Sequence, residues 1–256
     1  MTTATKFDVL CIHGIGKQRP GFSLQLRDGV LKAYEKMTRK DPAAPEIVWH
    51  EVYWADILDG DEKTLCERLK YPRGLRNLAA MFAGDVIGYS GEKYKRIQDR
   101  FKDVLSQVKT PSKVILVGHS LGTVIMTDAI YNHRFMLKTF PDEYKLDGVV
   151  TAGSPIALYS LRYGPDQFQA PIQPRKWINI RYPRDLIGYP LRPLNKAYGL
   201  AVHEDLVRWP SGSNILKTML RRSLCCLPLV SAACHTWYFD DPRVVKRIAA
   251  LMAFGE

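Results

Sequence analysis

The fold is decided by the stretch Lys113-Val114-Ile115-Leu116-Val117-Gly118-His119-Ser120-Leu121-Gly122 and the residues after it, Thr123-Val124-Ile125-Met126-Thr127-Asp128-Ala129-Ile130. An apolar run typical of a buried strand is followed by a segment typical of a helix. A Gly-x-Ser-x-Gly motif between them predicts a sharp turn that places Ser120 at the helix N-terminus with an exposed hydroxyl. Side chains at Gly118 or Gly122 would crowd the neighbouring strand and helix. The alternative is a structural turn with a capping serine.

Strand-like and helix-like segments alternate along the rest of the chain. We expect strands at 7–12, 46–54, 113–117, 146–152 and 177–182, and helices at 24–39, 61–83, 92–108, 123–135 and 241–254. This alternation predicts an α/β fold with a mainly parallel central sheet and helices on both faces. A chain of 256 residues suits a single domain, 1–256, with one insertion.

Composition narrows the classes of partner. The formal net charge of +11 is compatible with binding to nucleic acid or to anionic surfaces. Basic residues are mixed with acidic ones and no aromatic-basic motif is present, so we expect no nucleic-acid partner. Two interpretations remain open: an ordinary solvated basic surface, and attraction to anionic lipid or an acidic substrate.

The cysteines and the absence of targeting signals bear on location. The chain has five cysteines, an odd number without Cys-x-x-Cys spacing, so neither a disulfide framework nor a zinc site is expected. Neither a secretory signal nor a membrane-spanning run is visible. We expect a cytoplasmic location, with peripheral membrane contact as an alternative. Cys225-Cys226 beside Arg221-Arg222 suits an acylation site or an anchor, although buried thiols are commoner.

A reactive serine needs a base within hydrogen-bond reach and a third group that orients the base. Of the six histidines, His235 lies shortly before the last expected helix, at the carboxyl end of the sheet where ligands bind in open α/β folds. His235 is therefore the preferred general base. His203 is its main competitor, and simple packing among aromatic residues is the structural alternative.

The orienting acid is expected to follow a strand at the same end of the sheet. Asp185 comes directly after the strand at 177–182, which gives the chain order serine, aspartate, histidine. Glu204 and Asp205 remain alternatives. The alternative interpretation of Asp185 is a carboxylate that only forms an ion pair with Arg181 or Arg184.

Acyl chemistry also needs backbone donors for the oxyanion of the tetrahedral intermediate. The N–H of Leu121, directly after the serine, is one expected donor. The turn His13-Gly14-Ile15-Gly16 is expected to supply the second, from Ile15 in the first place and Gly14 in the second. This turn lacks the spacing of a phosphate-binding loop.

Together these motifs resemble the α/β-hydrolase superfamily, specifically its lipase and serine-esterase branch. The residues that carry the resemblance are His13 to Gly16, Gly118 to Gly122, Thr151 to Pro155, Asp185 and His235. The resemblance implies hydrolysis of a carboxylic ester or thioester, from a small-molecule or lipid substrate, through an acyl-serine intermediate. It implies neither a metal nor an organic cofactor. A catalytically silent binding module and an acyltransferase using the same residues are the alternative functions.

The interval 188–233 does not fit the alternation of strands and helices. It is rich in proline and glycine and contains the apolar patch Leu224 to Val230. Because it lies between Asp185 and His235, we expect a lid or cap over the site. The patch and the aromatic residues 237–239 favour a hydrophobic acyl chain.

Overall fold

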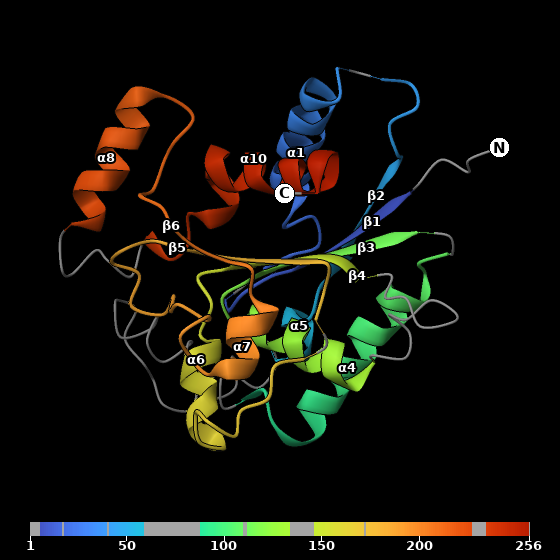
Figure 1. Ribbon diagram of the computed structural model, residues 1–256, viewed down its shortest axis with the longest axis vertical. Coiled ribbons are helices and arrows are strands. Elements are labelled where there is room, and N and C mark those ends of the chain that lie inside the picture. Colours follow the sequence, from blue (N-terminus) through green and yellow to red (C-terminus); the bar gives the residue numbers. More distant parts are fainter. Residues whose placement is uncertain are drawn as a thin grey trace.

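The computed structural model describes residues 6–16, 18–39, 41–58, 88–109, 112–133, 146–171, 173–226 and 234–255. Its centre is a six-stranded sheet in the order β2-β1-β3-β4-β5-β6, with every pairing parallel (Figure 1). The strands are β1 (Phe7–Ile12), β2 (Ile47–Val52), β3 (Lys113–His119), β4 (Leu146–Ala152), β5 (Lys176–Arg181) and β6 (Glu204–Val207). The predicted α/β fold with a parallel sheet is confirmed.

Helices cover both faces of the sheet (Figure 1). On one face α1 (Leu24–Met37) packs against α10 (Pro242–Phe254). The opposite face carries α4 (Gly91–Ser106), α5 (Leu121–Asn132), α6 (Ile156–Tyr159) and α7 (Lys196–Ala201). Right-handed crossovers explain this division, because α1 leads the chain from β1 outward to β2, whereas α4 and α5 lead it across the sheet in the opposite direction.

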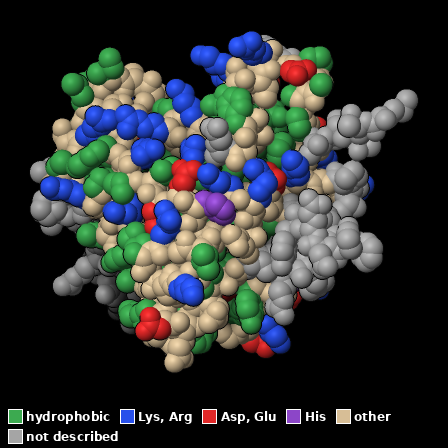
Figure 2. Space-filling view, in the orientation of Figure 1, with side chains coloured by type: hydrophobic (Ala, Val, Ile, Leu, Met, Phe, Trp, Pro, Cys, Tyr) green, Lys and Arg blue, Asp and Glu red, His purple; other side chains and the backbone are tan. Residues whose placement is uncertain are grey.

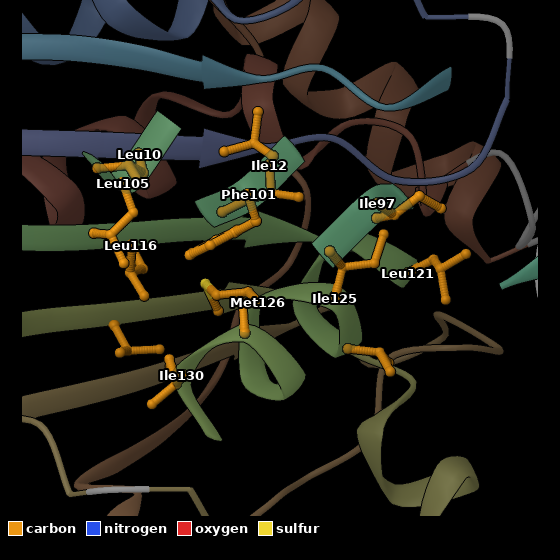
Figure 3. Packing of buried hydrophobic residues seen from close by; sticks show 14 of the residues in the cluster. Leu10, Ile12, Ile97, Phe101, Leu105, Leu116, Leu121, Ile125, Met126 and Ile130 are labelled. Atoms are coloured by element: carbon orange, nitrogen blue, oxygen red, sulfur yellow. The ribbon is translucent and has the colours of Figure 1, made fainter. Parts of the chain in front are cut away.

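The continuous apolar run of β3 reflects burial on both faces. Val114 and Leu116 belong to the core beneath α4 and α5, while Ile115 and Val117 belong to the core beneath α1 and α10. Figure 3 shows side chains of α4 and α5, including Phe101 and Ile125, packed against the strands. Each such side chain contributes roughly 1.5–3 kcal/mol on full burial.

The element boundaries agree with the sequence-based expectations to within a few residues at α1, α4, β2, β5 and α10. The two ends of α10 show why. At its start, Asp241 accepts a hydrogen bond from the Arg243 N–H and Pro242 occupies the first turn. At its end, Gly255 terminates the helix with a φ of 75°. The helix predicted at 61–83 lies outside the described residues. Among the described helices, none is long and apolar enough to cross a membrane.

The interval 188–233 contains more helix and strand than the sequence predicts. It contains α7, β6 and α8 (Ile215–Cys225), and β6 is the edge strand of the sheet beside β5. The Glu204 carboxylate holds this strand in place through Lys176 at 2.7 Å and Arg247 at 2.6 Å. β6 therefore belongs to the central sheet. Residues 227–233 lie outside the described part of the chain, and a lid elsewhere in the interval stays a prediction.

The turn between β3 and α5 packs against the end of β1. A Cβ atom at Gly122 would lie 2.8 Å from the carbonyl oxygen of Ile12 and closer still to that of His13. At Gly118 it would lie 3.1 Å from the Cα of Thr123. Both glycines are therefore required by close packing, as the motif predicts.

We expect Gly122→Ala to lower the free energy of unfolding by about 3 kcal/mol, because backbone atoms of β1 cannot give way as a flexible side chain would. Urea denaturation measures this loss. The matched control is Gly164→Ala, where the φ of 84° causes strain but no atom lies within 4 Å of the added Cβ. An equal loss in the two variants would contradict the packing explanation.

Candidate active site

The candidate site lies at the carboxyl edge of the sheet, between β1 and β3. These neighbouring strands are followed by connections that lead in opposite directions, to β2 and to β4. Such a switch point leaves a crevice in which ligands bind in open α/β sheets. The turn after β1 and the turn after β3 meet here, since a Cβ at Gly14 would lie 2.6 Å from the Cβ of Ser120.

Ser120 occupies a strained backbone conformation, with φ 53° and ψ −132°. Hydrogen bonds on both sides hold it there: its N–H donates to the Ala152 carbonyl at 3.0 Å, and its carbonyl accepts from the Thr123 N–H at 2.9 Å and hydroxyl at 2.7 Å. A side chain in this region of φ and ψ costs of order 1–3 kcal/mol and persists only where its surroundings enforce it. The strained serine turn is as the sequence predicts.

The expected exposure of Ser120 is wrong, because the residue is completely buried. The Gly14 backbone lies against its Cβ, and the His235 ring lies against its hydroxyl. Water therefore has little access to the serine in this conformation. The motif alone does not reveal this, since the covering atoms come from other parts of the chain.

Two further predicted residues, His235 and Asp185, lie in line with this serine. The Nε2 atom of His235 lies 2.7 Å from the Ser120 Oγ, and the Nδ1 atom lies 2.9 and 3.0 Å from the carboxylate oxygens of Asp185. His235 is 5% exposed and Asp185 is 9% exposed. The three side chains thus form a buried, hydrogen-bonded line from carboxylate to imidazole to hydroxyl.

The Asp185 carboxylate is stabilised in its charged form. Burial by itself raises the pKa of Asp185, but hydrogen bonds from His235, from the Ile187 N–H at 2.9 Å and from the Tyr238 hydroxyl at 2.7 Å outweigh it. The net result is a pKa below the ordinary value. An ionised Asp185 accepts a hydrogen bond from the Nδ1–H of His235, which leaves Nε2 unprotonated and facing the serine.

Tyr238 contributes to this arrangement although the sequence analysis assigned it no polar role. Its hydroxyl donates to Asp185 and accepts from the Tyr182 N–H at 2.7 Å, and its ring stacks on the Tyr182 ring at 4.0 Å. Burial, followed by the nearby Asp185 charge, raises the pKa of Tyr238 well above its ordinary value. The phenol therefore stays protonated and remains a donor. Its position three residues after His235 is the only signal in the sequence.

His119 holds the loop that carries His235. Its Nε2–H donates to the His235 carbonyl at 2.6 Å, and the two rings lie 4.8 Å apart. Burial lowers the pKa of His119 to about 3, so the imidazole is neutral at ordinary pH. No local pattern signals this contact, because His119 and His235 are far apart in the chain.

The turn after β1 is fixed by His13 and Trp54. The Trp54 N–H donates to Nε2 of His13 at 3.1 Å, so Nδ1 carries the proton and donates to the Gly14 carbonyl at 2.7 Å. The two rings stack with centroids 4.6 Å apart. This packing holds Gly14 and Ile15 beside Ser120 and Leu121. That the backbone N–H groups of Leu121 and of Ile15 or Gly14 bind an oxyanion stays a prediction.

The competing residues lie at the edge of the sheet, around β6, with β4 and β5 between them and β3. His203 accepts a hydrogen bond from the Trp177 N–H at 3.1 Å, close to the start of β5. Asp205 accepts from the backbone N–H groups of Leu191 and Arg192, and Glu204 pairs with Lys176 and Arg247. These three side chains organise the edge of the sheet, and none of them contacts His235 or Ser120 in the hydrogen bonds of the described residues.

A cavity of about 310 Å³ runs along α5. Its lining includes five aromatic side chains, one carboxylate and one guanidinium: Tyr89, Ser90, Gly91, Tyr94, Val124, Thr127, Asp128, Ile156, Tyr159, Arg162, Tyr163 and Phe168. Val124 lies about one helical turn, roughly 6 Å, beyond Ser120. At the far end the Asp128 carboxylate accepts from the Tyr89 hydroxyl at 2.9 Å, and burial raises the pKa of Asp128 to about 6.

Comparisons with known proteins add little to this geometry. No protein-family model matches the sequence, and no curated protein matches it. Among solved structures, the chain is similar to the metagenomic carboxyl esterase MGS0156, with a TM-score of 0.41 and 11% identity over 98% of this chain and 76% of that one. It is also similar to an azoreductase from Bacillus anthracis str. Sterne, with a TM-score of 0.30 and 10% identity over 96% and 98%. At these values neither protein is informative about the chemistry of this chain.

The described residues contain no group of three or more histidine, cysteine, aspartate or glutamate side chains placed to hold a metal ion.

The buried histidines predict how stability depends on pH. Burial lowers the pKa of His13 to about 4, below the ordinary value near 6.5, so the folded protein binds fewer protons than the unfolded chain between these values. The free energy of unfolding therefore falls as the pH drops from about 6.5 to 4. For His13 this loss amounts to about 3 kcal/mol, and His119 acts in the same direction.

Urea denaturation at pH 7.5, 5.5 and 4.5 tests this dependence in the wild type and in His13→Gln. The variant is expected to be less stable at pH 7.5 but to lose less stability on acidification. Asp128, whose raised pKa acts in the opposite direction, is present in both proteins and cancels in the comparison. Parallel pH profiles for the two proteins would show that His13 is not held neutral.

Proposed function

We propose that the protein is a serine hydrolase that cleaves carboxylic esters, of small molecules or lipids, through an acyl-serine intermediate. The observation that carries this proposal is the 2.7 Å approach of the His235 Nε2 to the Ser120 Oγ, with Asp185 on the opposite side of the imidazole. A nucleophile, a base and a group that orients the base within hydrogen-bond distance are what acyl transfer requires. The resemblance of the motifs to the lipase and serine-esterase branch of the α/β-hydrolases implies the same activity.

In the first half of the reaction the Ser120 Oγ attacks the ester carbonyl carbon while His235 Nε2 takes the hydroxyl proton. The resulting imidazolium is stabilised by the Asp185 carboxylate, which keeps its charge because three donors surround it. Nε2 then returns the proton to the departing alkoxide, which leaves as the alcohol. The acyl group remains bound to the serine oxygen.

In the second half a water molecule loses its proton to His235 Nε2 and attacks the acyl carbon. Collapse of this second tetrahedral intermediate releases the carboxylic acid and returns the proton to Ser120. The backbone N–H groups of Leu121 and of Ile15 or Gly14 are proposed to bind the oxyanion in both halves. Each donor of this kind is typically worth several kcal/mol of transition-state stabilisation.

The cavity along α5 is the proposed site for the apolar part of the substrate. Its near end, at Val124 and Ile156, adjoins the serine turn, because the Ile156 N–H donates to the Ser154 hydroxyl, which in turn bonds to the Thr123 hydroxyl. The rings of Tyr159, Tyr163 and Phe168 provide contact area for a chain or ring. Asp128 and Arg162 suit a polar group at the far end.

Hydrolysis of p-nitrophenyl esters from acetate to palmitate tests the assignment. We expect Ser120→Ala and His235→Ala to lower kcat/KM by about 10³-fold or more, while the control His203→Ala retains activity. A fluorophosphonate probe should label the wild type and not Ser120→Ala. Labelling of both proteins would contradict the choice of nucleophile.

The alternative functions give different results in the same experiments. A catalytically silent binding module would leave the folded wild type unlabelled by the probe. An acyltransferase would give an ester product instead of free acid when a competing alcohol or thiol is present.

The cavity assignment has its own test. We expect Tyr163→Ala and Phe168→Ala to raise KM for long-chain esters by about ten-fold, through the loss of aromatic contact area, and to leave the acetate ester almost unaffected. Leu161→Ala is the matched control, because Leu161 is 72% exposed and does not line the cavity. Equal effects on short and long esters would place the acyl chain elsewhere.

A further inference from the structure

The helix α8 directs its apolar side chains into solvent. Ile215 and Leu216 are each 77% exposed, Met219 is 63% exposed and Leu220 is 57% exposed. Their spacing of one, four and five residues places them on one face of the helix. The opposite face is covered by the protein and buries Arg221 and Cys225. This is the reverse of an ordinary surface helix, which buries its apolar side.

Two further exposed apolar residues lie on segments adjoining α8. Trp209 is 40% exposed and Leu186 is 63% exposed, and Leu186 directly follows Asp185. The Arg184 guanidinium joins this loop to α8 by donating to the Cys226 carbonyl at 2.7 Å. We call these six side chains the α8 face: Leu186, Trp209, Ile215, Leu216, Met219 and Leu220.

The charged residues of the segment that carries α8 are of one sign. The segment from 207 to 226 contains no aspartate or glutamate, and its basic residues are Arg208, Lys217, Arg221 and Arg222. Arg221 is occupied with Asp240 and the Ser211 carbonyl. Among the salt bridges of the described residues, none involves the other three. Figure 2 shows hydrophobic and basic side chains next to one another where α8 lies.

We infer that the α8 face docks on the surface of an anionic lipid bilayer. A short helix with an apolar face flanked by lysine and arginine lies in the bilayer interface, where the apolar side chains enter the acyl region and the cations meet lipid phosphates. Tryptophan is favoured at this depth. A second copy of the chain is a poorer partner, because a two-fold contact would bring the same basic residues of both copies together.

The position of α8 links this surface to the candidate active site. The buried Sγ atoms of Cys225 and Cys234 lie 2.8 Å apart, and Cys234 directly precedes His235. At the other side, Leu186 follows Asp185. A docked α8 face therefore holds both triad loops close to the lipid. The conclusion that the substrate is then a lipid ester rests on the proposed function, whereas the docking itself does not.

Co-sedimentation with vesicles tests the docking independently of catalysis when the Ser120→Ala protein is used. Vesicles of phosphatidylcholine alone are compared with vesicles that also contain phosphatidylglycerol, at low and physiological salt. We expect binding to the anionic vesicles to be stronger and to weaken with salt. Lys217→Gln and Arg222→Gln should each reduce the affinity about five-fold.

The apolar contribution is tested by Ile215→Ser with Leu216→Ser, which should reduce binding at least about ten-fold. The matched control replaces Leu161 and Phe254 by serine, since these are 72% and 59% exposed on other elements. Substitutions at such exposed positions leave the core intact, and a thermal melt verifies folding. Equal binding to neutral and anionic vesicles, or equal loss in the control, would overturn the inference.

Light scattering tests the alternative occupant of the α8 face, a second copy of the chain. If the protein is a dimer that Ile215→Ser with Leu216→Ser converts to a monomer, and no vesicle binds, the α8 face is an interface between copies and the membrane proposal is wrong. Loss of esterase activity in Ser120→Ala bears only on the proposed function, because vesicle binding is measured in that variant.

Discussion

The contact between the start of α5 and the end of β1 is the constraint on which the candidate site depends. At Gly122 the helix approaches the carbonyl groups of Ile12 and His13 so closely that a methyl group has no room. This approach forces the serine turn into its strained conformation and places Gly14 against Ser120. The energetic cost of the strain is offset by packing of α5 within the core, where most of its residues are buried.

A second chain of contacts fixes the base. Hydrogen bonds run from the Tyr182 N–H through the Tyr238 hydroxyl to Asp185, and from Asp185 through His235 to Ser120. Inside a protein each such bond is stronger than in water, and a missing partner would be correspondingly costly. The line therefore has one well-defined geometry, although it joins three loops that are distant in the sequence.

The centre and the edge of the sheet have different uses. At the carboxyl ends of β1 and β3, imidazoles, one carboxylate and backbone groups surround the serine. At the edge, Glu204 makes ion pairs and Asp205 accepts backbone hydrogen bonds, and these contacts hold β6 beside β5. Both acidic residues thus have a structural role, because β4 and β5 separate β6 from the strand that carries the serine.

Much of the fold and site could be read from the sequence because local patterns encode them. Apolar runs of β1, β3 and β4 mark strands that are buried on both faces. Ser120 and Asp185 stand out because each follows a strand, and His235 stands out because it precedes the last helix. Only the tertiary structure decided that Glu204 begins a strand, since two acidic residues followed by two apolar ones carry no periodic signal and long-range ion pairs fix them. It alone decided that Ser120 is buried, that Tyr238 and His119 hold the acid and the base, and that α8 turns its apolar face outward. These features depend on contacts between residues far apart in the chain, which local patterns do not record.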